Sequence, residues 1–128
     1  MKKALVLATA MLFVASTAMA QGIDGSAHDF EEATWNGTDE ICVVCHTPHS
    51  ADVAVSEAPL WNHELSPATT YDVYSSSSLQ ASVGQPDGES KLCLACHDGQ
   101  VALENFGGNT GGTNNISTAN NVGTDLSD

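Results

Sequence analysis

The chain contains no arginine and only three lysines, against 16 aspartate and glutamate residues. Two of the lysines, Lys2 and Lys3, stand at the very start, so residues 21–128 carry a single basic side chain, Lys91. Proteins that bind nucleic acid or anionic membranes need clusters of basic residues that neutralise phosphate. The composition therefore excludes both as expected partners, and the acidic surface favours encounters with basic proteins instead.

Aromatic residues are also scarce, at 5% of the chain. A domain of about 100 residues has little stability to spare, so we expect something besides apolar side chains to hold this one together. The sequence shows neither a long amphipathic period nor a series of strands. It predicts a mostly irregular coil with a few short α-helices, ending in a Gly/Asn/Thr-rich tail at residues 107–128 that has few apolar anchors.

The N-terminus is typical of a secretory signal peptide. Lys2 and Lys3 precede an apolar stretch that ends in the small-x-small site Ala18-Met19-Ala20, where cleavage is expected. The stretch is short and rich in small residues for a membrane anchor, and nothing later is predicted to span a bilayer. We therefore expect residues 1–20 to be removed and residues 21–128 to form one exported domain, either at the cell surface and outside the cell or in the periplasm.

All four cysteines lie in two copies of one motif, Cys-x-x-Cys-His, at Cys42–His46 and Cys93–His97. This motif is the attachment site of c-type haem. Two thiols about one helical turn apart can each form a thioether with one vinyl group of the porphyrin, and the following histidine then binds the iron. The sequence predicts two covalently attached haem c groups, held by Cys42, Cys45, Cys93 and Cys96.

Two other interpretations of the cysteines are weaker. Paired cysteines of a structural zinc site usually lie about 15–20 residues apart, whereas 47 residues separate Cys45 from Cys93. Two disulfides are compatible with an oxidising compartment. Neither interpretation gives a role to the histidine that follows each pair.

His46 and His97 are the expected proximal ligands of the two irons. Every methionine lies in the first 20 residues, so the His/Met ligation that raises the potential of cytochromes c is excluded from residues 21–128. Three histidines remain as candidate distal ligands, namely His28, His49 and His63. Ligation of both irons by two histidines predicts low-spin, low-potential haems without an open coordination site, and therefore no enzymatic activity.

Chain length restricts which histidine binds which iron. His49 is three residues from His46, and three residues span at most about 10–11 Å, too little to reach the opposite face of the same porphyrin. We expect His49 on the second haem and either His28 or His63 on the first, which leaves one histidine spare. Lys91 is expected to be solvated or paired with a haem carboxylate. Trp35, Trp61 and Tyr71 are expected to pack against haem.

The chain resembles the multihaem c-type cytochromes with doubled Cys-x-x-Cys-His motifs, in particular secreted cytochromes of metal-reducing bacteria, some of which polymerise into conductive filaments. The resemblance covers nearly all of residues 21–128 and rests on Gly25–Phe30, Cys42–His49, Ala58–Asn62, Val83–Pro86 and Leu92–Gly99. In relatives of this type, a stretch like Gly123–Ser127 continues into a His-Pro element and further haem motifs. Here it is followed by Asp128, so a ligand supplied by that later histidine must come from elsewhere, such as an adjacent subunit.

The resemblance implies electron transfer through closely stacked haems. The implied partners are other copies of the chain, in a homopolymeric filament, together with redox proteins or extracellular electron acceptors. The alternatives are a soluble periplasmic electron shuttle and, with less support, a haem-based sensor or structural module. Because the haems would form much of the core, the chain without haem is expected to be largely disordered.

Overall fold

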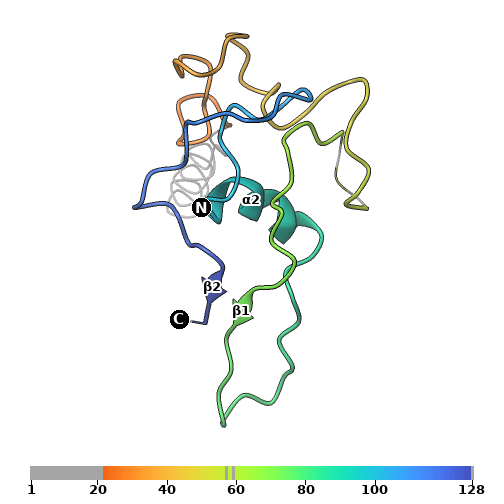
Figure 1. Ribbon diagram of the computed structural model, residues 1–128, viewed down its shortest axis with the longest axis vertical. Coiled ribbons are helices and arrows are strands. Elements are labelled where there is room, and N and C mark those ends of the chain that lie inside the picture. The colour runs from red at the N-terminus through yellow and green to blue at the C-terminus, as the bar shows by residue number, and fades with distance from the viewer. Residues whose placement is uncertain (1–21, 57, 59, 128) are drawn as a thin grey trace, which may run out of the picture.

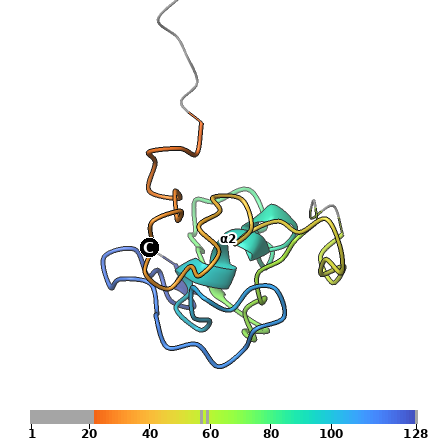
Figure 2. The same ribbon diagram turned by 90° about the horizontal axis from the view of Figure 1, so that it is seen from above.

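The computed structural model describes residues 22–56, 58 and 60–127. Its regular elements are strand β1 (Asp72–Val73), helix α2 (Glu89–His97) and strand β2 (Asp125–Leu126). The remaining described residues form turns, bends, isolated bridges and irregular loops, and both views show these loops wound around α2 (Figures 1 and 2). The prediction of a mostly irregular chain is confirmed, although the described part holds one helix where a few were expected.

The expected signal peptide lies outside the described residues. Over the ranges that are described, no helix combines the length and the apolar character needed to cross a membrane.

Glycines in the left-handed region stand at both ends of α2. Gly88 precedes the helix with φ +52°, and Gly99 follows it with φ +72°. The Gly99 amide donates to the Cys96 carbonyl oxygen at 3.2 Å, which closes the last turn in the manner of a glycine C-cap. Glu89 lies in the first turn, where a carboxylate complements the helix dipole. Gly99 therefore ends α2.

The apolar core is small and forms around one face of α2. Leu92 and Ala95, three residues apart and so on one side of the helix, pack with Val55 and Trp61, and all four are buried. Cys45, Ala58 and Leu65 cover the edge of this cluster. The second Cys-x-x-Cys-His motif is therefore part of the core, and the first packs against it.

Buried polar side chains extend this small core. Asp98 is 1% exposed and accepts hydrogen bonds from the hydroxyls of Ser66 and Tyr71 and from the Gln100 amide. Burial, together with the hydrogen bond to Asp98, raises the pKa of Tyr71 above its usual value, so its hydroxyl stays protonated and donates. The side chain of Asn36, which is 3% exposed, also forms hydrogen bonds, in this case with main-chain groups of the N-terminal segment.

The C-terminal segment is docked onto the rest of the described chain. Its anchors are hydrogen bonds, which a search for apolar residues does not detect. The Glu104 carboxylate accepts from the Thr113 amide at 2.7 Å and from the Asn114 side chain at 2.7 Å. Further along, the Val122 amide donates to the His97 carbonyl oxygen at 2.7 Å, which ties the segment to the end of α2.

The two strands bring together distant parts of the sequence. Asp72 pairs with Asp125 and Val73 with Leu126 in a parallel register, at the end of the molecule away from the N-terminal segment (Figure 1). Residues 68–74, which include β1, contain no helix.

Gly99→Ala is expected to destabilise the protein. An L residue in the left-handed region costs about 1–2 kcal/mol, and an added Cβ would lie 2.2 Å from Nδ2 of Asn121, which must move. Denaturant unfolding followed by circular dichroism measures the loss. Gly37→Ala is the matched control, because its Cβ meets nothing within 4 Å and its φ is not left-handed. Equal stability of the two variants would contradict this account of the helix end.

Glu104→Gln is expected to remove part of the pH dependence of stability. Burial alone would raise the pKa of Glu104, but the hydrogen bonds from Thr113 and Asn114 outweigh it and lower the pKa below 4.5. A carboxyl whose pKa is lowered by folding stabilises the protein above its unfolded pKa and loses this effect as pH falls through the folded value. Wild type should therefore exceed the variant in Tm at neutral pH and converge with it in acid.

Glu31→Gln, on an exposed side chain, is the control for this pH series. A Glu104→Gln profile parallel to that of wild type down to acid pH would show that the Glu104 carboxylate does not anchor the C-terminal segment.

Candidate functional site

The first motif forms a single helical turn. The amides of Cys45 and His46 both donate to the Cys42 carbonyl oxygen, at 3.2 and 2.9 Å. Asn62 holds this turn from outside: its side chain donates to the Val43 carbonyl oxygen, and its amide donates to the Cys45 carbonyl oxygen at 3.0 Å. The turn leaves Cys42 and His46 exposed and Cys45 partly buried.

The second motif occupies the C-terminal half of α2, with His97 as its last residue. Cys93 is exposed and Cys96 is partly buried, so the two motifs present their thiols alike. Nδ1 of His97 lies 2.8 Å from the Asn120 carbonyl oxygen. A histidine that donates from Nδ1 to a carbonyl keeps Nε2 unprotonated, as metal ligation requires.

The four thiols are free in the structure. Burial is the main cause that raises the pKa of Cys45, and burial raises that of Cys96 to about 12. The charge of Cys93 contributes to the shift at Cys45, and that of Cys45 to the shift at Cys96, so the two motifs lie close together. Within the described ranges, no group of three or more His, Cys, Asp or Glu side chains is placed to hold a metal ion.

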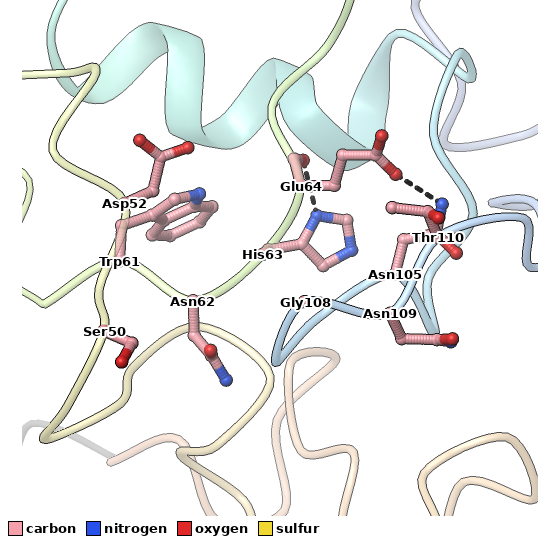
Figure 3. A pocket seen from close by; sticks show the side chains of 10 residues that line it. All are labelled: Ser50, Asp52, Trp61, Asn62, His63, Glu64, Asn105, Gly108, Asn109 and Thr110. Carbon is pink, nitrogen blue, oxygen red and sulfur yellow. Dashed lines mark hydrogen bonds between the residues drawn. The ribbon is translucent and has the colours of Figure 1, made fainter.

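His63 lies beside the second motif, deep in the protein. It is 1% exposed, its Nδ1 lies 2.9 Å from the Glu64 carbonyl oxygen, and its Nε2 lies 3.6 Å from Sγ of Cys96. The ring faces a cavity of about 220 Å³ that is also lined by Asn105 (Figure 3). As in His97, the hydrogen bond at Nδ1 leaves Nε2 as the ring nitrogen that could bind a metal ion, and in the structure this Nε2 adjoins the Cys96 thiol.

His28 also lies at the second motif. Its ring centre is 6.1 Å from that of His97, with the planes tilted by 57°. A metal ion that binds two imidazoles, each through one nitrogen at about 2 Å, holds the ring centres roughly 6 Å apart. The separation of His28 and His97 therefore matches that of two axial ligands on one metal.

His49 is placed differently from the other candidate ligands. Its side chain is exposed, and the two hydrogen bonds that join it to Thr47 use its main chain. The expected assignment put His49 on the second haem and His28 or His63 on the first, whereas the structure places both His28 and His63 beside the second motif. Lys91, the expected solvated lysine, is exposed on α2.

An apolar groove of about 390 Å³ opens beside the exposed Cys93. Its aliphatic and aromatic walls come from β1, β2, α2 and the loop before α2, namely from Val73, Tyr74, Val83, Pro86, Leu94 and Leu126. The groove offers an apolar surface to any group attached at Cys93. The groove could not be predicted from the sequence, because it depends on the pairing of β1 with β2, two strands of two residues each.

The described residues fit a covalently attached haem in three respects. Both motifs form a helical turn with an exposed first thiol, two histidines are oriented by hydrogen bonds at Nδ1, and an apolar groove adjoins Cys93. The buried Nε1 of Trp61 also has no hydrogen-bond partner within the described part of the chain, which suits a group with an acceptor.

No protein-family model matches the chain, and no curated protein is significantly similar to it.

Proposed function

We propose that the protein is an exported dihaem c-type cytochrome that transfers electrons and catalyses no reaction of its own. One observation carries the proposal. At the second motif, Cys93 opens onto an apolar groove, and His97 faces a second imidazole, His28, at the separation of two axial ligands. The matching Cys42–His46 turn supports a second haem of the same kind.

The geometry favours an assignment of four histidines to two irons. His97 and His28 would hold the iron of the second haem, because their ring centres lie 6.1 Å apart. His46 and His63 would then hold the iron of the first haem, because Asn62, the neighbour of His63, is bonded to the first motif, although Nε2 of His63 lies 3.6 Å from Sγ of Cys96 in the structure. This assignment leaves exposed His49 unused and replaces the expectation that it binds the second iron.

Each bound haem supplies one-electron chemistry, and the chain supplies the environment. The carbonyl oxygens of Asn120 and Glu64 fix the rings of His97 and His63 through Nδ1. Ligation by two imidazoles, with no methionine in residues 21–128, favours a low potential. Because this ligation uses both axial positions, the irons have no site for substrate, which favours electron transfer over catalysis.

The resemblance favours a polymer, whereas the surface charge favours basic redox partners. Carboxylates outnumber basic side chains 16 to 3 over the whole chain, so basic redox partners are attracted at long range. The resemblance to secreted cytochromes adds copies of the chain itself as partners, in an extracellular filament. A soluble periplasmic shuttle is the second candidate, and it shares the same haem site.

Expression of the full chain in a bacterial host that attaches haem c tests the proposal. The expected product is exported, lacks residues 1–20, and has the intact mass of residues 21–128 plus two haem groups. A variant with Cys93→Ser and Cys96→Ser should carry one haem, and so should the matched variant with Cys42→Ser and Cys45→Ser. Absence of haem from the wild-type product, with zinc or disulfides in its place, would refute the cytochrome.

Electron microscopy of material sheared from the same cells distinguishes the two electron-transfer candidates. Thin filaments that contain the chain support the conductive polymer, whereas a product found only as a periplasmic monomer supports the shuttle.

His28→Ala is expected to convert one of the two haems to a five-coordinate, high-spin ferric form that binds cyanide, because it removes the partner of His97. His49→Ala is the matched control and should leave both haems low-spin. Electron paramagnetic resonance and the visible absorption spectrum report the spin states. High-spin iron in His49→Ala, with His28→Ala unchanged, would reverse the assignment proposed above.

A further inference from the structure

Trp61 lies between the two motifs. Its main chain forms bridges with His46 and Asp52, and its carbonyl oxygen accepts from the Asp52 amide at 2.8 Å. Its indole is 7% exposed, belongs to the core cluster that includes Leu92 and Ala95 of α2, and has its ring centre 6.4 Å from that of His63. One side chain thus adjoins both places at which haem is proposed to attach.

The indole nitrogen of Trp61 is a buried donor without a partner. Of the side chains in the described ranges, Trp61 has the single buried nitrogen or oxygen atom that makes no hydrogen bond. Nearly all buried polar groups in proteins are bonded, and an unpaired donor costs about 1–3 kcal/mol. The other deeply buried polar side chains, including those of Asn36, His63 and Asp98, have partners.

The chemistry of the missing partner is restricted. An indole N–H can only donate, so the partner must be an acceptor. The rim of a haem carries methyl groups, thioether links and two carboxylates, and only the carboxylates accept strongly. The one lysine or arginine of residues 22–127, Lys91, is exposed on α2, so a buried haem carboxylate would need uncharged N–H or O–H donors.

We propose that the N–H of Trp61 donates a hydrogen bond to a carboxylate of one bound haem. This inference rests on the proposed function, because it requires a haem at one of the two motifs. The hydrogen bond fixes the haem edge against the core and withdraws negative charge from it. Trp61 is therefore a positioning residue that also raises the reduction potential of the haem it contacts.

Trp61→Phe tests the inference, because it keeps an aromatic ring in the core and deletes the donor. Trp35→Phe is the matched control: Trp35 is the other tryptophan of the chain, is only partly buried, and packs against Phe30 at 5.1 Å. Haem content is measured first by intact mass. Resonance Raman spectra with Soret excitation then report the carboxylate bending band, and spectroelectrochemical titration reports both potentials.

In Trp61→Phe, we expect the carboxylate band of one haem to shift and one of the two potentials to become more negative, because the unbonded carboxylate stabilises ferric iron. Trp35→Phe should change neither. If Trp61→Phe carries two haems and matches wild type in both readouts, the hydrogen bond is refuted, while the dihaem protein stands.

A wild-type measurement covers the case in which Trp61→Phe fails to fold or to load haem. Ultraviolet resonance Raman of wild-type holoprotein, assigned with Trp35→Phe, should show a strongly hydrogen-bonded indole N–H for Trp61. A spectrum typical of an unbonded indole would overturn the inference. Absence of haem from the wild-type protein would refute the proposed function, and the inference with it.

Discussion

The packing of Trp61 against α2 is the interaction on which the rest of the structure depends. Leu92 and Ala95 contribute the helix side of this contact, and Cys45 packs at its edge. Because the contact joins the two Cys-x-x-Cys-His motifs, it fixes their separation and orientation. A chain with few aromatic residues thus has its small core where two cofactors are proposed to attach, so loss of this contact would disturb folding and cofactor geometry together.

Hydrogen bonds to polar side chains stabilise the segments that make few apolar contacts. Asn62 holds the first motif, Asp98 connects the end of α2 to Ser66 and Tyr71, and Glu104 fastens the C-terminal segment. Such bonds are directional and lose their contribution when a donor or acceptor is displaced. They give irregular segments a defined position without helix or sheet, which explains how a mostly irregular chain can hold histidine rings in fixed orientations.

The sequence was informative about local features and much less so about contacts between distant segments. Motif spacing located both helical turns, because such a turn depends on a few adjacent residues. Chain distance alone suggested His49 for the second motif, whereas the structure puts His28 and His63 there. The docking of residues 103–126 escaped prediction too, since its anchors are amides and carboxylates with no periodic pattern, and the groove beside Cys93 depends on that docking.

The orientation of the histidines bears on the proposed electron transfer. Both His97 and His63 have Nδ1 bonded to a carbonyl oxygen, which restrains each ring in the folded chain and disfavours the ligand exchange that a sensor requires. The same rigidity lowers the structural change between oxidation states, because neither ring must rotate when the charge on an iron changes. A fold that restrains the imidazoles of His97 and His63 is therefore better suited to passing electrons than to opening a coordination site.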